Sequence, residues 1–230
     1  MLFLGSRARL ALRAPPPRDA LPTLVLDLDE TVLHRPGGLL DQVALYAYPS
    51  STVGVPYAHA LESLRALSAR FNLAAITARF RLAEGNTTRW LEAQGLADLP
   101  VIYAGSVHAG DASRGPFKAA AIRCLRSAGW RPTAGVGDRP SDLEAYAGEG
   151  LTALMVAHAE GAAGDAPARR ARALREAQGR HPGAEVHFFS DCSAAREAFG
   201  GAAALGGQGS VWQQVTAALL KGSLSDGKIK

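Results

Sequence analysis

The chain has 230 residues, of which 47% are hydrophobic and 20% are charged, and a formal net charge of +4 at pH 7. This length can bury a sizeable core, and the composition is that of an ordinary soluble domain rather than of a disordered or fibrous protein. The mild positive charge is compatible with an anionic substrate and gives no reason to expect nucleic acid as a partner. No apolar run approaches the length of a membrane span. The two cysteines form no disulfide framework, which favours a reducing, intracellular compartment such as the cytoplasm.

Residues 1–21, MLFLGSRARLALRAPPPRDAL, differ from the rest of the chain. They hold four arginines and three consecutive prolines, and their first acidic residue is Asp19. A basic leader of this kind is typical either of a disordered extension or of an organelle transit peptide, and the loose match to transit peptides favours the first. We therefore expect the catalytic domain to comprise residues 22–199.

From residue 23 onwards, predicted strands alternate with predicted helices. In chain order we expect a strand at 23–29, a helix at 57–71, a strand at 72–77, a helix at 81–96, a strand at 99–105, a helix at 116–130 that opens at Pro116, a strand at 132–138, a helix at 140–150 and a strand at 151–157. The strands are apolar on both faces, as in a sheet covered by helices on both sides. The alternation predicts an α/β fold with a doubly wound, mostly parallel sheet of the Rossmann type.

The remaining segments carry weaker signals. Residues 168–180, ARRARALREAQGR, indicate a helix with a solvated basic face. Five glycines between residues 200 and 209 predict a linker, and residues 210–222, SVWQQVTAALLKG, predict one docking helix after it. We therefore expect residues 200–230 to form a linker, a C-terminal helix and a tail.

Polar side chains gather where the predicted strands end. They are Asp27, Asp29 and Thr31 after the first strand, Thr77 and Arg79 at the second, and Asp138 and Arg139 after the fourth. Two carboxylates separated by one leucine, with no basic residue in the run, are costly unless a positive ion is expected there. Because the carboxyl ends of parallel strands meet at one edge of the sheet, these residues should converge. Lys118, near the start of the helix after the third strand, should face the same place.

Such a set of side chains suits the handling of a phosphoryl group. One carboxylate can attack phosphorus, a second can transfer a proton, and a hydroxyl and an ammonium can hold the phosphoryl oxygens. Carboxylates are the all-oxygen ligands that suit Mg²⁺, whereas the six histidines form no pair at the spacing expected of zinc ligands. The sequence therefore predicts a site that handles a phosphoryl group with the help of magnesium, and a phosphorylated substrate as its partner.

The segments DLDET, ITAR, the isolated Lys118 and GDRPSD resemble, in this order, the four motifs of the haloacid-dehalogenase superfamily, in its phosphatase branch. The resemblance covers most of residues 24–157 and is specific because four short motifs come in the family's order. It implies that Asp27 is the nucleophile and forms an aspartyl-phosphate, and that Asp29 is the general acid and then the base. Dehalogenases of this superfamily lack the second aspartate, so Asp29 favours phosphoester hydrolysis.

The same resemblance implies the other ligands. Thr77 and Lys118 would hold the phosphoryl oxygens. Magnesium would be bound by the Asp27 carboxylate, the backbone carbonyl of Asp29 and the Asp138 carboxylate, with Asp142 in support. Thr31, Arg79 and Arg139 would either contact substrate or pair with neighbouring groups at the rim.

Different motifs of this chain resemble different subfamilies of the superfamily. DLDETVLH resembles the first motif of carboxyl-terminal-domain phosphatases and of bacterial class B and C acid phosphatases. GDRPSDLEAYAGEGL is similar to the last motif of lipin-type phosphatidate phosphatases, although Asp138 stands where those commonly have asparagine. Neither subfamily covers the whole chain.

The spacing of the motifs predicts an enzyme without a cap domain. Only 45 residues separate Thr31 from Thr77, and 40 separate Thr77 from Lys118, which is too few for a folded insert besides the predicted elements. A hairpin over residues 34–53 would then be the only shield of the nucleophile. An open site of this kind favours a bulky substrate, such as a phosphoprotein or a lipid phosphate, over a free sugar phosphate.

Two other function classes stay open. A phosphoacceptor switch of the response-regulator kind also uses aspartates, a hydroxyl and a lysine, but its acceptor follows the third strand, which here ends in IYAG without an acid. A binding module of the same fold without turnover is the second. Phosphate release from a generic ester separates the hydrolase from both.

Overall fold

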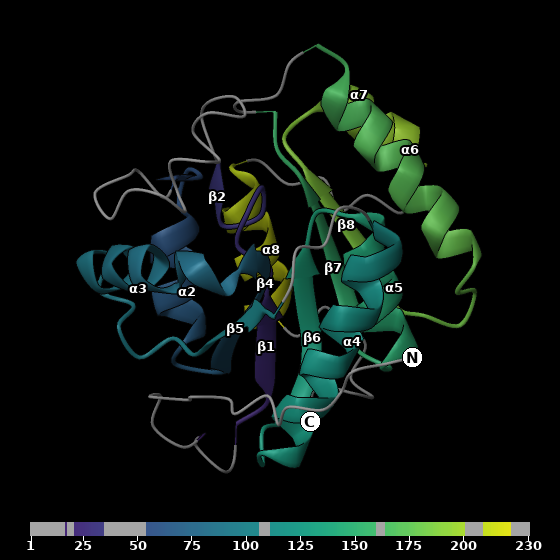
Figure 1. Ribbon diagram of the computed structural model, residues 1–230. Helices are drawn as coiled ribbons and strands as arrows, with labels where there is room; N and C mark the ends of the chain where they lie inside the picture. Colours follow the sequence, from purple (N-terminus) through teal and green to yellow (C-terminus); the bar gives the residue numbers. More distant parts are fainter. Residues whose placement is uncertain are drawn as a thin grey trace.

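The computed structural model describes residues 17, 21–34, 54–105, 111–159, 164–200 and 209–221 (Figure 1). Its elements in chain order are β1 (Thr23–Leu26), β2 (Leu33–His34), β3 (Val55–Pro56), α2 (Ala60–Leu67), β4 (Asn72–Phe80), the 3₁₀ helix η1 (Arg81–Ala83), α3 (Glu84–Ala93), β5 (Val101–Ala104), α4 (Asp111–Ser127), β6 (Pro132–Gly137), α5 (Pro140–Gly148), β7 (Thr152–Ala157), α6 (Ala166–Gly179), β8 (Val186–Ser190), α7 (Ser193–Phe199) and α8 (Val211–Leu220). Nearly all of the predicted leader, hairpin and glycine-rich linker lies outside the described residues. At the two ends of the predicted hairpin, β2 and β3 pair antiparallel.

Six strands form one parallel sheet in the order β5-β4-β1-β6-β7-β8. The chain places β4 and β5 on one side of β1, and then returns to add β6, β7 and β8 on the other side. The predicted doubly wound, parallel α/β fold is confirmed. The strand order reverses between β1 and β6, and sheets of this kind bind their ligands beyond the carboxyl ends of the strands at such a reversal.

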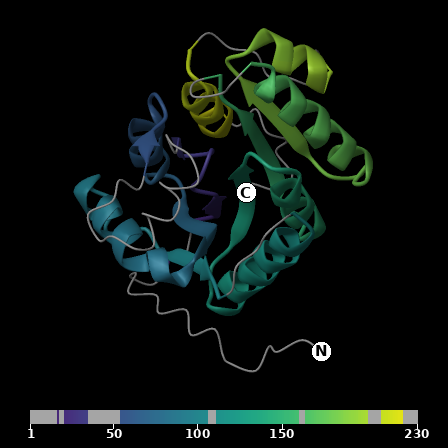
Figure 2. The same cartoon turned by 45° about the horizontal axis from the view of Figure 1, so that its top comes forward.

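Helices bury both faces of this sheet, and the side chains of β1 alternate between the two faces. Leu24 and Leu26 pack into a cluster with α2 and α8, whereas Val25 belongs to the cluster formed with α4, α5, α6 and α7. Figure 2 shows α4 to α7 along one side of the sheet and α2 and α8 on the other. All four residues of β1 are fully buried, which explains why three of them, Leu24 to Leu26, are apolar in succession.

Three features differ from the expectations. The helix expected to open at Pro116 begins at Asp111, so Pro116 lies inside α4, where it removes one main-chain hydrogen bond without ending the helix. β4 continues to Phe80, three residues beyond Thr77. β8 and α7 were not expected, because VHFFS is a short run whose first two residues are only partly buried and gives no clear period.

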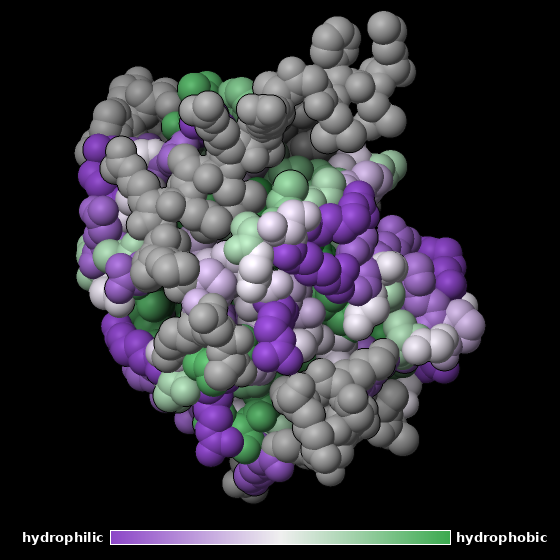
Figure 3. Space-filling model, turned by 90° about the horizontal axis from the view of Figure 1, so that it is seen from below, coloured by the Kyte–Doolittle hydropathy of each residue, from purple (hydrophilic) through white to green (hydrophobic). Residues whose placement is uncertain are grey.

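Few large apolar side chains are exposed in the described part of the chain, the most exposed being Val55, Leu82 and Leu220. On the face shown in Figure 3, hydrophobic residues form small separate groups among hydrophilic ones. Within the described residues, no helix has both the length and the apolar character that a membrane span requires.

Candidate active site

A tight loop after β1 presents Asp27 at the end of the sheet. The main-chain N–H of Asp27 donates to the carbonyl of Val136 on β6 at 2.9 Å, so the strand pairing extends to this residue. The N–H of Leu33 then donates back to the carbonyl of Leu28 at 3.1 Å. Between them, Glu30 has a φ of 59°, a left-handed conformation that few non-glycine residues adopt. The chain thus turns back directly after Asp27, which is only 5% exposed.

Two side chains from distant parts of the sequence hold this loop by one carbonyl group. Trp212 on α8 donates its indole N–H to the carbonyl oxygen of Thr31 at 2.9 Å, and Nε2 of His158 lies 3.1 Å from the same oxygen. Burial lowers the pKa of His158 to about 3, so its ring is neutral at pH 7 and Nε2 carries the proton that the carbonyl accepts. The His158 ring also stacks on Tyr57, with centroids 3.5 Å apart. The loop is therefore fixed by α8 and by the end of β7 as well as by its own turn.

The turn between β6 and α5 places two further aspartates beside Asp27. A Cβ on Gly137 would meet the Asp142 side chain at 2.6 Å, so only glycine lets α5 approach the strand this closely. Oδ2 of Asp142 accepts the main-chain N–H groups of Asp138 at 3.1 Å and of Arg139 at 3.0 Å. Asp142 stands in the first turn of α5, where the helix dipole favours a negative charge. It therefore fixes the turn that carries Asp138.

Lys118 on α4 supplies a buried positive charge between two of the carboxylates. Its Nζ lies 3.1 Å from Oδ2 of Asp27 and is also bonded to Oδ1 of Asp142. Burial by itself lowers the pKa of Lys118, but the carboxylates of Asp142 and Asp27 more than offset this, so the pKa lies above its ordinary value. The ammonium stays charged at neutral pH.

Asp138 has a carboxylate oxygen that makes no hydrogen bond. Its Oδ1 accepts the hydroxyl of Thr31 over a long 3.4 Å, whereas Oδ2 is buried and has no hydrogen-bond partner. Nη1 of Arg170, on α6, lies 3.2 Å from Oδ2, so the guanidinium is a charge neighbour without hydrogen-bond alignment. A buried carboxylate oxygen in this state is costly unless a cation binds it.

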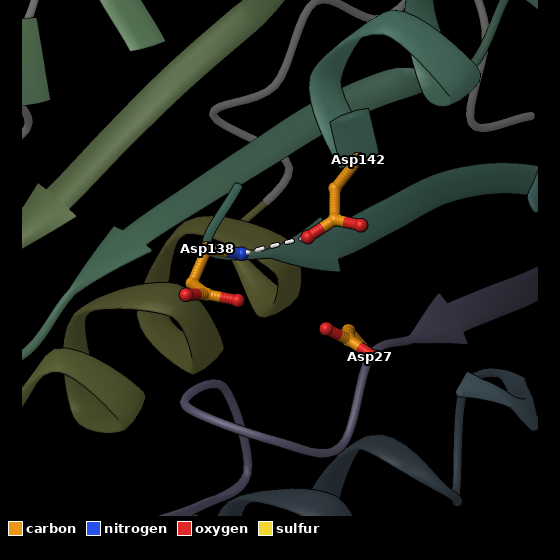
Figure 4. A group of neighbouring side chains, drawn as sticks. All are labelled: Asp27, Asp138 and Asp142. Atoms are coloured by element: carbon orange, nitrogen blue, oxygen red, sulfur yellow. Dashed lines mark hydrogen bonds between the residues drawn. The ribbon is translucent and has the colours of Figure 1, made fainter. Parts of the chain in front are cut away.

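The carboxylates of Asp27, Asp138 and Asp142 can together hold a metal ion. All three are buried, and each offers an oxygen within 4.8 Å of those of the other two. Figure 4 shows the three side chains around a common space at the ends of β1 and β6. Among the residues that the structure describes, no other group of potential ligands reaches this spacing. An all-oxygen set with an unused oxygen on Asp138 fits a hard divalent cation.

The side chain of Asp29 takes part in a separate ion pair. Nε and Nη2 of Arg79 donate to its two oxygens at 2.9 and 2.7 Å, and Nη1 of Arg79 donates to the hydroxyl of Thr87 at 3.1 Å. Arg79 is almost fully buried. The hydroxyl of Thr77 accepts the main-chain N–H of Arg79 at 3.2 Å. Of the two roles considered for Arg79, pairing with an acid is the one that the structure shows.

Burial raises the pKa of two of the three clustered acids, Asp27 and Asp138, and so favours their neutral forms. It raises the pKa of Asp27 from 3.8 to about 7, against the opposing charge of Lys118. The pKa of Asp138 rises to about 6, again chiefly through burial and despite Arg170. A dication among these oxygens favours the ionised forms, so metal binding should release protons at neutral pH.

The shift at Asp138 predicts a pH-dependent gain in stability for Asp138→Asn in chelator. Wild-type Asp138 keeps its proton up to about pH 6 when folded but loses it near pH 4 when unfolded, so its contribution to the free energy of unfolding falls as pH rises between these values. Asparagine carries no charge at any pH. The free energy of unfolding of Asp138→Asn relative to wild type should therefore be higher at pH 8 than at pH 4 by about 1–3 kcal/mol.

Urea denaturation of both proteins at the two pH values measures this difference. The comparison between two proteins is needed because burial lowers the pKa of His158 to about 3, which makes its own contribution to stability rise with pH. His158 is the same in both proteins, so its effect cancels. A relative stability that stays constant or falls towards pH 8 would contradict the buried, ionised Asp138.

The predicted site residues form two connected groups. The first group contains Asp27, Lys118, Asp142, Asp138, Arg139 and Thr31. The second group contains Asp29, Arg79 and Thr77. Asp142 lies among the potential metal ligands themselves, whereas only a supporting position was expected for it. Arg170 was missed, because an arginine-rich helical segment indicates a solvated face. Helical spacing could have indicated that Arg170 faces inward, because it lies three residues after Pro167 and four before Leu174, and both of these are buried.

Comparisons with known proteins give only distant likenesses. No family model matches the chain, and no curated protein matches it. Among solved structures, an uncharacterized protein from Listeria monocytogenes serotype 4b is 20% identical over 63% of this chain and 83% of its own, with a TM-score of 0.44. A "putative haloacid dehalogenase-like hydrolase" from Burkholderia xenovorans LB400 is 14% identical over 79% of this chain and 97% of its own, with a TM-score of 0.45. At such identities and TM-scores, an assignment of function has to follow from the residues of this chain.

Proposed function

We propose that this protein is a magnesium-dependent phosphomonoester hydrolase that works through an aspartyl-phosphate on Asp27. The observation that supports this most directly is the surroundings of Asp27. Its buried carboxylate shares a potential metal site with Asp138 and Asp142, and the Lys118 ammonium lies 3.1 Å from one of its oxygens. Magnesium suits a site that combines few carboxylates with phosphate oxygens, and when bound it would neutralise charge on the phosphoryl group.

The chain's own residues can carry out both halves of the reaction. In the first, an oxygen of Asp27 bonds to phosphorus while the bond from phosphorus to the ester oxygen breaks, and the leaving oxygen takes a proton from Asp29. In the second, Asp29 takes a proton from water as the water oxygen bonds to phosphorus and the bond to Asp27 breaks. Ester and water thus become alcohol and phosphate. The Thr77 hydroxyl and the Lys118 ammonium are the proposed donors to the phosphoryl oxygens.

Asp29→Asn is expected to slow hydrolysis in a way that depends on the leaving group. An asparagine cannot give a proton to the leaving oxygen, and alkoxides need that proton far more than 4-nitrophenolate does. The rate constant for release of the alcohol in the first half of the reaction should fall by about 10²- to 10⁴-fold for an alkyl phosphate and by less for 4-nitrophenyl phosphate. Rapid-quench kinetics with both esters measures this. Equal losses for the two esters would contradict the role of Asp29 as general acid.

The substrate class that we favour is a bulky ester, either a phosphoprotein or a lipid phosphate. Between β1 and β4 the described elements are only the β2–β3 pair and α2, and between β4 and α4 they are η1, α3 and β5. Neither connection is long enough for a folded cap besides these elements. A purified monomer that hydrolyses a small metabolite far more efficiently than any macromolecular ester would argue against this class.

One observation favours a second candidate function, a phosphoacceptor or binding module without turnover. Arg79 occupies both oxygens of Asp29, the residue that the second half of the reaction needs. If that pair never opened, phosphorylated Asp27 would persist. Phosphate release from 4-nitrophenyl phosphate with magnesium decides between the two. Many phosphates per protein molecule support the hydrolase, whereas release of the phenol that stops at one per molecule supports the alternative.

A further inference from the structure

Arg170 holds hydrogen-bond donors that the described part of the chain leaves unused. Its one contact there is the 3.2 Å approach of Nη1 to Oδ2 of Asp138, which lacks hydrogen-bond alignment. A guanidinium carries five N–H donors in a planar fork that matches phosphate and carboxylate oxygens. Arg172, on the same helix, instead points to Asp165 at 3.8 Å and is more exposed. Arg170 alone of these two faces the metal-binding cluster.

The exposed fractions of the charged side chains show how deeply each one is buried. The side chain of Lys118 is 1% exposed and that of Asp27 is 8% exposed, whereas that of Arg170 is 27% exposed. A phosphoryl group bonded to Asp27 therefore lies deep, beside Lys118. The rest of the ester has to extend towards solvent. Arg170 lies in that outer part, on the β6 side of Asp27.

Magnesium and Arg170 compete for the same carboxylate. In the described part of the chain, the guanidinium of Arg170 is the cation nearest to Oδ2 of Asp138. A dication bound to Asp138 repels a guanidinium at this distance, because both positive charges would face one carboxylate in a buried setting. A bound dication would therefore weaken the hold of Asp138 on Arg170, and the guanidinium donors of Arg170 would be left to a new anionic partner.

We propose that Arg170 binds an anionic group on the leaving-group side of the substrate, so that preferred substrates are phosphomonoesters with a second phosphate or a carboxylate near the ester. The inference rests on the proposed hydrolase function and adds a charged group that the preferred ester carries beside the reacting phosphate. A phosphate and a carboxylate can each accept hydrogen bonds from the guanidinium of Arg170, and three matched esters distinguish between these two anions. The esters are 3-hydroxypropyl phosphate, 2-carboxyethyl phosphate and propane-1,3-diyl bisphosphate, which differ in the group at the end of a short chain.

The test compares Arg170→Gln and Arg170→Lys with the control Arg172→Gln on these three esters in magnesium. Arg170→Gln should lose about 10- to 100-fold more kcat/KM on the two anionic esters than on the hydroxyl ester, chiefly through KM. Arg170→Lys should recover part of this loss, and Arg172→Gln should behave as wild type. Without substrate, calorimetric titration should show that Arg170→Gln binds magnesium about 3- to 10-fold more tightly than wild type and Arg172→Gln do.

Each outcome is decisive. A loss confined to one of the two anionic esters supports the inference and identifies the anion. An equal loss on all three esters, or an unchanged magnesium affinity in Arg170→Gln, overturns it while leaving the hydrolase function in place. A wild-type protein that hydrolyses none of the esters, nor 4-nitrophenyl phosphate, overturns the proposed function and this inference with it.

Discussion

Asp27→Asn is expected to lower the turnover of any ester substrate by about 10⁴-fold or more, because the substitution removes the proposed nucleophile. Asparagine has nearly the shape of aspartate. Lys118 keeps its bond to Asp142 in this variant, so no buried ammonium is left without a partner. The fold should therefore survive. Steady-state phosphate release in magnesium measures the loss, and far-ultraviolet circular dichroism checks that the helices and strands are retained.

Asp98→Asn is the matched control for this substitution. Asp98 is exposed and lies in the connection that enters β5, at the opposite end of the strands from Asp27. The same chemical change there should leave turnover at the wild-type level. Magnesium-dependent turnover above a trace in folded Asp27→Asn would show that another group attacks phosphorus.

Removing divalent cations with a chelator is expected to abolish hydrolysis, and magnesium is expected to restore it. Zinc should replace magnesium poorly, because the ligands proposed are all oxygens. Asp138→Asn should raise the magnesium concentration needed for half-maximal rate by about 10- to 100-fold or more, since it removes a charged ligand. Titration of the rate with magnesium after exhaustive chelation measures both effects.

Asp29→Asn provides the matched control for the metal. The ligand proposed at this position is the backbone carbonyl, which the substitution keeps, and the Asp29 carboxylate is bonded to Arg79. This variant should therefore turn over slowly while keeping the magnesium requirement of wild type. Undiminished activity of wild type in excess chelator would rule out the metal-dependent mechanism.

The sheet could be predicted because its information is local. Leu24, Val25 and Leu26 are apolar in succession since helices cover both faces, and such runs alternate with helical spacing as far as residue 157. The convergence of Asp27 and Asp138 followed from that topology, because β1 and β6 are neighbours at the reversal of strand order. β8 and α7 carry no comparable period and were missed.

The pairing of side chains within the site could not be predicted, because it depends on packing between distant segments. Asp29 and Arg79 are 50 residues apart, and nothing in either motif indicates that the arginine takes both carboxylate oxygens. The central place of Asp142 depends on Gly137, whose missing Cβ allows the close approach of α5. Arg170 reaches Asp138 only because α6 packs beside α5, a contact that the sequence does not encode locally.

The hydrogen bond from Trp212 to the carbonyl of Thr31 spans 181 residues of sequence. Ribosomes add about 5–20 residues per second, so about 10–40 s pass between the synthesis of Thr31 and that of its partner. During that time the first strands of the sheet can already pair, but the loop that carries the proposed nucleophile lacks one of the two donors that hold it. The nascent protein therefore completes both the core on one face of its sheet and the loop that carries Asp27 only after α8 has left the ribosome.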